Sequence, residues 1–91
     1  MAYKIKYQKQ AVLDAAKLQK TEPSAFKKLL KLEAELREHP RTGTGHPEQL
    51  RGDRSNQWSR HITQKHRLVN EIYDTEVIVL VLTAYGHNED K

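Results

Sequence analysis

A carboxylate, imidazoles and guanidinium groups lie close together in the middle of this chain. Glu48 lies in residues 45–50 (GHPEQL), and residues 58–61 (WSRH) and 66–67 (HR) follow it. These side chains are of the types that transfer protons around a phosphodiester and bind its negative charge. Their presence in one short segment points to phosphodiester chemistry, and the competing interpretation is an ordinary solvated surface segment.

The positive charge of the chain is concentrated in the same segment. The formal net charge is +4, and residues 41–67 alone hold six basic and two acidic residues, which accounts for the whole excess. The basic residues are Arg41, Arg51, Arg54, Arg60, Lys65 and Arg67. A local basic patch favours a polyanionic partner such as RNA, DNA or an acidic protein segment, although charge alone supports a solvated loop equally well.

Length and composition favour one small domain over residues 1–91, able to fold around a modest core. The chain contains no cysteine, which excludes disulfides and thiolate chemistry and is compatible with a reducing cytosol. The N-terminus lacks the apolar stretch of a signal peptide, and the longest apolar run, residues 77–82, is too short to cross a bilayer. We therefore expect a cytoplasmic protein without a membrane partner.

Apolar spacing predicts one strand and two helices in the first half of the chain. Residues 3–7 alternate apolar and basic side chains, as a strand with one buried face does. Residues 9–20 have the pattern of an amphipathic helix, and Pro23 suits the first turn of a second helix that ends near Glu38. The apolar stripe of this second helix comprises Ala25, Leu29, Leu32 and Leu36, widened by Phe26 and Leu30.

The second half of the chain predicts a loop followed by three strands. Residues 41–57 are rich in glycine and form the loop, and residues 58–63, 66–73 and 76–84 form the strands, with a tight turn at Asp74-Thr75. The apolar run at 77–82 suits a central strand that is covered on both faces or lies at an interface. The order β-α-α-β-β-β predicts an α+β domain with two helices on one face of a mostly antiparallel four-stranded sheet.

Four motifs resemble the YoeB/Txe branch of the RelE-like toxins of bacterial toxin–antitoxin systems. They are Gly-x-Gly-x-Pro-Glu-x-Leu at residues 43–50, Trp-Ser-Arg-x-Ile-Thr at 58–63, His-Arg-Leu-Val at 66–69 and Tyr-Gly-His at 85–87. Their order and spacing match the family, and the order of elements is similar to that of the RelE-like microbial RNase fold.

This resemblance implies a toxin that cleaves messenger RNA in the ribosomal A site and is neutralised by a small antitoxin of the YefM/Axe type. It also implies metal-independent attack of the ribose 2′-OH on the phosphodiester, with a 2′,3′-cyclic phosphate product and no cofactor. A homodimer through the apolar last strand, or a hetero-oligomer with the antitoxin, stays open.

The resemblance assigns three catalytic roles. Glu48 is the general base for the 2′-OH, Arg67 is the clamp on the phosphoryl oxygens, and His87 is the general acid for the departing 5′ oxygen. By spacing alone, Glu48 is an ordinary surface glutamate and Arg67 the salt-bridge partner of a residue such as Glu71 or Glu48. On the same grounds His87 is a frayed residue near the terminus.

A second group of side chains is predicted to bind RNA or the ribosome. Arg51 and Arg60 would contact the RNA backbone or ribosomal RNA. Such contacts contribute to the binding affinity in a way that depends on salt concentration and not on the RNA sequence. His66 belongs with them, or alternatively orients a neighbour by hydrogen bonding. Trp58 is predicted to be a core anchor, with stacking on a nucleobase as the alternative.

The chain departs from the family motifs at three positions. Asn88 follows His87 where the family often has tyrosine, Asn70 replaces an aromatic residue, and His61 replaces an arginine. The loss of the tyrosine motivates a second hypothesis, a weakly active or inactive homologue that mainly binds its antitoxin and regulates their operon. A third hypothesis, a metal enzyme built on His61, His66 and Glu48, is disfavoured because the spacing matches no metal motif.

Overall fold

The structure is a computed structural model, and it describes residues 2–54 and 56–86. The elements are β1 (Lys4–Tyr7), α1 (Lys9–Thr21), α2 (Pro23–Glu38), β2 (Glu48–Gln49), the 3-10 turn η1 (Gly52–Arg54), β3 (Gln57–His61), β4 (Arg67–Tyr73) and β5 (Ile78–Thr83). The predicted helices and the first strand are confirmed almost to the residue.

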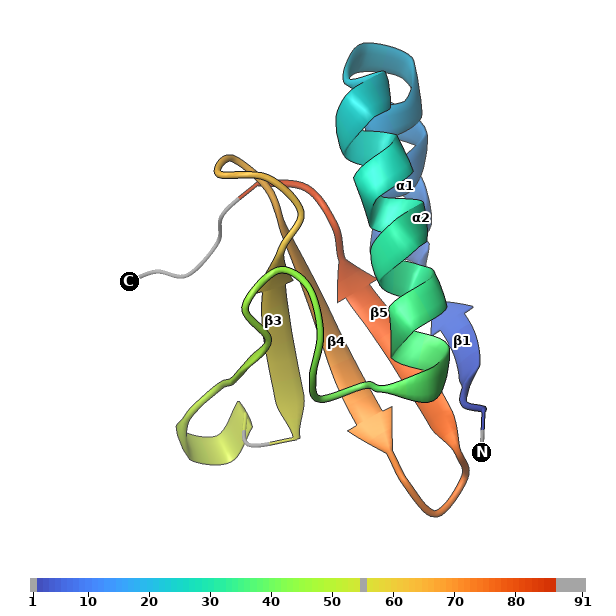
Figure 1. Ribbon diagram of the computed structural model, residues 1–91, viewed down its shortest axis with the longest axis vertical. Helices are drawn as coiled ribbons and strands as arrows, with labels where there is room; N and C mark the ends of the chain where they lie inside the picture. Colours follow the sequence, from blue (N-terminus) through green and yellow to red (C-terminus); the bar gives the residue numbers. More distant parts are fainter. Residues whose placement is uncertain (1, 55, 87–91) are drawn as a thin grey trace.

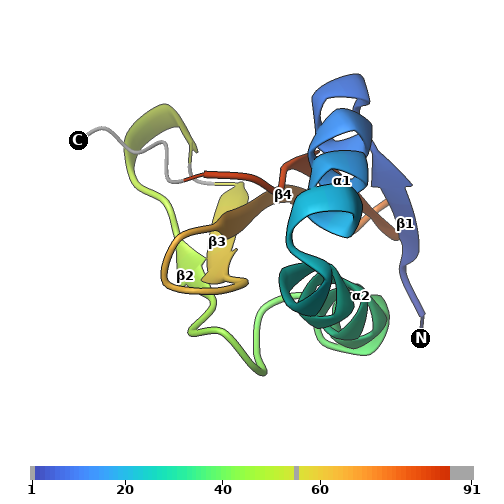
Figure 2. The same ribbon diagram turned by 90° about the horizontal axis from the view of Figure 1, so that it is seen from above.

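The strands form one five-stranded sheet in the order β1-β5-β4-β3-β2. β1 runs parallel to β5, and every other neighbouring pair is antiparallel. The two helices lie side by side over one face of the sheet (Figure 1), and the view from above shows β2 and β3 extending beyond them (Figure 2). The α+β class and the two-layer arrangement are therefore confirmed.

β2 is the strand that the sequence analysis missed, so the predicted count of four strands is wrong. It is two residues long and pairs Glu48 with Ser59 and Gln49 with Trp58, within the predicted loop at 41–57. A two-residue strand is too short to show the alternation by which strands are recognised, and only its pairing with β3 reveals it. Glu48 is therefore held by a sheet and not by a free loop.

The apolar stripe of α2 faces the sheet and forms much of the core. Its buried members are Ala25, Leu29, Leu32 and Leu36, at 0–3% exposure. Burial of each leucine stabilises the fold by roughly 1.5–3 kcal/mol. Leu30 is 48% exposed, so the stripe is narrower than the sequence predicted, and Phe26 packs at its edge.

β5 is a central strand, but only one of its faces is fully covered. Val79 and Val81 are completely buried against the helices. Ile78 and Leu80 point to the opposite face and are partly exposed. Among the described residues, β5 is therefore fully covered only on the face that packs against the helices, and not on both faces.

The turn between β4 and β5 is longer than the predicted Asp74-Thr75 turn, and β5 begins at Ile78. The amide of Val77 donates to the carbonyl of Asp74 at 3.2 Å, and Val77 has a φ of 58°. The Asp74 carboxylate accepts hydrogen bonds from the Arg41 guanidinium at 2.8 and 3.2 Å and from the Tyr3 hydroxyl at 2.6 Å. The bonds from Arg41 and Tyr3 lower the pKa of Asp74 and tie the turn to β1.

Candidate active site on the open face of the sheet

Strand register places Glu48 and Arg67 on the same face of the sheet. Glu48 pairs with Ser59, and Ser59 pairs with Val69, which is two residues from Arg67 on β4. Paired residues of neighbouring strands point to the same face, and so do alternate residues of one strand. Leu68 points to the helices and is fully buried, so Glu48 and Arg67 share the open face, away from the helices.

Arg67 begins β4, next to the chain that leaves β5. It pairs with His61 of β3, and its backbone amide donates to the carbonyl of Gly86 at 2.9 Å. The register of β4 against β5 shifts between Val69 and Asn70, so β5 carries an extra residue before Thr83. Such bulges redirect the chain next to functional sites, and here the bulge lies between the sheet core and the segment that leads to His87.

Arg60 is buried inside the protein, at 1% exposure, so the prediction that it contacts RNA is not compatible with this structure. Its guanidinium donates hydrogen bonds to Glu35 Oε1 at 3.3 Å and to the carbonyls of Pro40, Thr42 and Thr44 at 3.2–3.4 Å. Burial lowers the pKa of Arg60, and the charge of Glu35 opposes this effect. The side chain therefore holds the segment between α2 and β2, which carries Glu48.

Glu35 of α2 is the counter-ion in this buried cluster. Its carboxylate accepts hydrogen bonds from the Thr44 amide at 2.8 Å and the Thr44 hydroxyl at 2.7 Å. Burial raises the pKa of Glu35, but the two bonds from Thr44 and the charge of Arg60 outweigh it, so the net pKa is lowered. Glu35 is thus kept ionised opposite the Arg60 guanidinium.

Gly43 and Gly45 let this segment pass close to its neighbours. Gly45 has a φ of +88°, and a Cβ there would lie 2.6 Å from the carbonyl oxygen of His61. Gly43 has a φ of +117°, and a Cβ there would lie 2.5 Å from Glu35 Oε1. The amide of His61 in turn donates to the Gly45 carbonyl at 2.7 Å. The Gly-x-Gly motif therefore sets the position from which Glu48 enters β2.

His66 is also buried, at 1% exposure, which corrects its prediction as an RNA-binding residue in favour of the alternative of orienting a neighbour. Its Nε2 lies 2.9 Å from Glu22 Oε2, and its Nδ1 accepts a hydrogen bond from the Gly86 amide at 2.8 Å. The Tyr85 ring lies against the imidazole, with 4.3 Å between ring centroids. Both ring nitrogens are therefore engaged within the protein.

Two of the predicted site residues remain outside this network. Arg51 is exposed between β2 and η1, as a backbone-binding arginine needs to be. His87, and with it Asn88, lies outside the described residues, directly after Gly86 in the chain. Trp58 is partly buried opposite Asn70, so it is neither a full core residue nor a free stacking platform.

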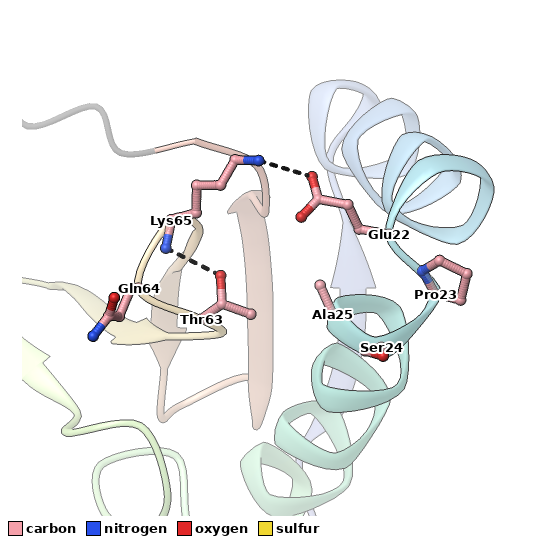
Figure 3. A pocket seen from close by; sticks show the side chains of 7 residues that line it. All are labelled: Glu22, Pro23, Ser24, Ala25, Thr63, Gln64 and Lys65. Carbon is pink, nitrogen blue, oxygen red and sulfur yellow. Dashed lines mark hydrogen bonds and ion pairs between the residues drawn. The ribbon is translucent and has the colours of Figure 1, made fainter.

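Two surface pockets flank the turn between β3 and β4. One has a volume of about 610 Å³ and lies between the start of α2 and the turn, with Lys65 reaching Glu22 across its upper edge at 3.7 Å (Figure 3). The other, of about 570 Å³, is lined by Lys28, His46 and His61 among others. Neither lining includes Glu48 or Arg67, so the candidate site is a face of the sheet and not one of these hollows.

The residues of the metal-enzyme hypothesis do not form one metal site. No group of three or more histidine, aspartate and glutamate side chains suited to a metal ion occurs among residues 2–54 and 56–86. Both ring nitrogens of His66 are hydrogen-bonded, one to Glu22 and one to the Gly86 amide, so neither is available for a metal ion shared with His61. The expected absence of a cofactor stays a prediction.

Neither helix of the described chain has the length and apolar character needed to span a membrane.

Three acidic residues that support the candidate site could not be identified from sequence motifs. None of the three belongs to a sequence motif, and each forms a hydrogen bond with a residue that is distant in the chain; they are Glu22, Glu35 and Asp14. Only Asp14 could have been recognised from the sequence, because it lies three residues after Ala11 and four before Leu18, within the buried stripe of α1. An acidic residue at such a position needs a buried donor, and the Ala84 amide supplies it at 2.9 Å.

The sequence and the fold are similar to those of known toxins. A family model described as "YoeB-like toxin of bacterial type II toxin-antitoxin system" matches residues 7–87. Toxin YoeB of Mycobacterium bovis is 41% identical over 54 residues, which is 59% of this chain and 64% of the relative, so the match spans less than two thirds of that relative's length.

Solved structures match over a larger share of the chain. A YoeB/ParE toxin from Agrobacterium tumefaciens superposes with a TM-score of 0.87 at 28% identity, covering 93% of this chain and 99% of the other. The toxin in the YoeB-YefM complex from Staphylococcus aureus does so with a TM-score of 0.81 at 25% identity, covering 97% and 100%. Because the family model spans most of the sequence and the same fold recurs in these toxins, the chain belongs to the family of YoeB-like toxins of bacterial type II toxin–antitoxin systems.

Proposed function

We propose that this toxin is a messenger-RNA endoribonuclease that acts on translating ribosomes in the bacterial cytoplasm. The observation that carries the proposal is the shared open face of Glu48 and Arg67, which come from β2 and β4 and lie on either side of β3. A base and a guanidinium on one exposed sheet face can engage the same phosphodiester from neighbouring positions.

The proposed reaction divides the work among three residues. The Glu48 carboxylate takes the proton of the ribose 2′-OH as its oxygen attacks the phosphorus, and the bond from phosphorus to the 5′ oxygen breaks. Arg67 bears the charge that develops on the phosphoryl oxygens, and His87 gives a proton to the departing 5′ oxygen. The products are a 2′,3′-cyclic phosphate and a 5′-hydroxyl end, and no metal ion is required.

Support for a rigid base comes from the buried cluster behind it. Arg60, Glu35 and Thr44 hold the loop that delivers Glu48 to β2, and preorganised groups stabilise a transition state without reorganising during the reaction. Arg51 remains a proposed RNA contact, since its charge is exposed on the same segment. Arg60 acts behind Glu48 in this proposal and does not touch RNA.

The proposed partner is an antitoxin of the YefM type. A YoeB toxin of similar fold occurs in a complex with YefM, and residues 41–67 of this chain hold its entire positive excess. An acidic, extended segment laid over this face would cover Glu48 and Arg67 together and so prevent RNA from binding. A toxin dimer is also compatible with the partly exposed apolar residues of β5, Ile78 and Leu80.

The test is primer extension on a messenger RNA that is being translated in vitro. The parent chain should produce new 5′ ends, and Glu48→Gln and Arg67→Ala should each lower the cleavage rate by about 10²–10³-fold. Glu76→Gln, an exposed change in the β4–β5 turn, is the matched control and should cleave as the parent does. Parental rates in both site variants would overturn the assignment, and a cleaved product without a 2′,3′-cyclic phosphate would overturn the proposed attack by the 2′-OH.

A second candidate function rests on Asn88, which stands where the family often has a tyrosine. In this alternative the chain cleaves weakly or not at all and mainly binds its antitoxin to regulate their operon. Tight antitoxin binding without new 5′ ends, together with cleavage restored by Asn88→Tyr, would favour it over the first proposal.

A further inference from the structure

A surface pocket lies at the end of β3, beside the strand that carries Arg67. It has a volume of about 570 Å³, and its lining comes from α2, from the segment between α2 and β2, from β3 and from the β3–β4 turn. The lining side chains that can carry positive charge are Lys28, His46 and His61, and no carboxylate is among the described residues that line it. The pocket is therefore suited to an anion and not to a cation.

His61 connects this pocket with the proposed active face. It is the last residue of β3 and pairs with Arg67 of β4. The side chains of directly paired residues lie on the same face of a sheet, with Cβ atoms roughly 4.5–5.5 Å apart. A phosphate bound by Arg67 would therefore lie next to His61, which is on the strand between β4 and β2.

The segment that joins α2 to β2 (Figure 2) holds His46 against His61. The His61 amide donates to the Gly45 carbonyl at 2.7 Å, and the two imidazole rings meet edge to face with 6.3 Å between their centroids. His46 has a φ of 54°, a left-handed conformation that residues with a side chain rarely adopt. Such backbone strain is found at binding and catalytic sites, where the surrounding structure maintains it. Two imidazoles are thus held together at the pocket.

Lys28 approaches the same pocket from the helical layer. Its ammonium group donates to the carbonyl of Ile62, the residue after His61, at 3.4 Å. An ammonium group has three donor hydrogens, so this contact leaves donors that can meet a ligand. The charged groups around the imidazoles are Lys28 from α2, Arg67 from β4 and Glu48 from β2. A bound phosphate would add negative charge, which favours protonated imidazoles.

We propose that Lys28, His46 and His61 form a second phosphate-binding subsite beside the proposed active face. It takes the RNA backbone phosphate that neighbours the one held by Arg67. A protonated imidazole is charged and donates from both nitrogens, so the subsite binds RNA more tightly as the pH falls through the range in which histidine titrates. An arginine, which the family has in place of His61, would be charged throughout this range. The inference rests on the proposed function, because its ligand is the same RNA.

Two substitutions of His61 separate a titrating contact from a permanent one. The probe is a short single-stranded RNA with 2′-O-methyl riboses, which lacks the attacking hydroxyl, and its affinity is measured by fluorescence anisotropy at about pH 5.5 and about pH 8. His61→Arg should match the parent at the acidic pH and bind about tenfold more tightly at the basic pH, the factor expected for one hydrogen bond to a charged group. His61→Asn should match the parent at the basic pH and bind about tenfold more weakly at the acidic pH.

His39→Asn is the matched control, because His39 is exposed at the end of α2 and does not line the pocket. It should keep the parental affinity at both pH values. The subsite is overturned if each His61 variant differs from the parent by the same factor at both pH values, or if His39→Asn behaves as His61→Asn does. The same responses with a short oligoglutamate peptide in place of RNA would overturn the assignment to phosphate.

The second measurement uses the unsubstituted toxin and inorganic phosphate, so it does not depend on how a variant folds. In nuclear magnetic resonance spectra at about pH 6.5, the ring signals of His46 and His61 should move together as phosphate is added. The ring signals of His39 should stay in place. Equal movement at His39, or no movement at His46 and His61, would overturn the subsite.

Failure of this inference can be distinguished from failure of the proposed function. If the parent does not cleave translated messenger RNA but the two His61 variants show their opposite responses to pH, the proposed function is wrong and the phosphate subsite stands. If the parent cleaves and both variants bind RNA as the parent does at both pH values, only the subsite is wrong.

Discussion

At the scale of single residues, burial separates the arginines of the basic segment into two kinds. Arg51 and Arg60 looked alike in sequence, but Arg51 is exposed and Arg60 is 1% exposed with its guanidinium on Glu35 and three carbonyls. A buried charge is tolerated only when it is paired and hydrogen-bonded, and the loop before β2 satisfies that need. The position of Glu48 therefore depends on an ion pair on the other face of the sheet.

The Arg60–Glu35 pair predicts an acid-sensitive contribution to stability. Glu35→Gln should lower the free energy of unfolding by about 2 kcal/mol at pH 7, because Arg60 stays buried without its counter-ion. The pKa of Glu35 is lowered in the folded state, so its contribution is complete above the unfolded pKa of about 4.3 and is lost as the pH falls through the lower folded value.

Urea denaturation of the parent and Glu35→Gln from pH 3 to pH 7 checks this prediction. The difference between the two proteins should be largest at neutral pH and should shrink below pH 4. A difference that is constant with pH, or that grows in acid, contradicts the assignment of Glu35 as an ionised partner.

Two glycines with positive φ provide a second prediction at this scale. Gly45→Ala should destabilise the fold by about 2–3 kcal/mol, because it adds a contact with the His61 carbonyl to the cost of a left-handed backbone. Gly52→Ala is the matched control, since Gly52 has a φ of +72° with nothing within 4 Å of its Cβ position, and it should cost about 1 kcal/mol.

Thermal unfolding and cleavage assays of both variants check it. Gly45→Ala should also slow cleavage, since the same segment carries Glu48, whereas Gly52→Ala should not. Equal losses of stability in the two variants would show that the close approach to His61 does not matter.

At the scale of elements, β4 connects the core with the candidate site. Leu68, Asn70 and Ile72 point to the helices, and Arg67 and Val69 point to the open face. Asn70 is 1% exposed, and neither its amide nitrogen nor its oxygen has a hydrogen-bond partner in the described chain. The departure from the family motif at this position therefore leaves an unsatisfied amide in the strand that carries Arg67, the proposed phosphate clamp.

This unsatisfied amide predicts a stabilising substitution. Asn70→Val should raise the free energy of unfolding by about 1–2 kcal/mol, because it removes two buried polar atoms without partners and adds a β-branched side chain to a central strand. Asn70→Asp is the contrasting variant and should destabilise strongly, since it buries a charge. Chemical denaturation measures both, and a destabilised Asn70→Val would show that the amide has a partner after all.

At the scale of the whole molecule, the core and the candidate site lie on opposite faces of the sheet. The helices and the buried face of the sheet provide the core, and the opposite face carries Glu48 and Arg67. The helical layer also reaches the site indirectly, because Asp14 and Glu22 hold the segment that leaves β5. Substitutions of these two residues in the helical layer would therefore disturb contacts with the sheet and with the segment that leaves β5.

The concentrated charge predicts how binding to RNA depends on salt. Arg51→Gln should weaken binding at low salt and reduce the slope of log affinity against log salt by about 1, because one phosphate contact is lost. Lys20→Gln, at the exposed end of α1, is the control and should leave the slope unchanged. Affinity for a messenger-RNA fragment, measured at several salt concentrations, decides between the two, and equal slopes would remove Arg51 from the proposed interface.

The periodicity of apolar residues in the sequence predicts much of this fold. The alternation of residues 3–7 and the leucine spacing of α2 depend only on which face of a strand or helix is buried, and neighbouring residues contain that information. The position of the β4–β5 turn was predicted, but its length could not be found in the same way, because Asp74 is held by Tyr3 and Arg41, which are far away in the chain.

The sequence by itself determined the order of both helices and of four of the five strands, the basic segment and the motifs that carry Glu48, Arg67 and His87. Only the tertiary structure decided that Glu48 belongs to a strand, that Glu48 and Arg67 share a face, and that Arg60 and His66 are buried. The physical reason is that a strand register and a buried ion pair join residues that are distant in sequence. Arg60 meets Glu35 and His66 meets Glu22 only after the helices pack on the sheet.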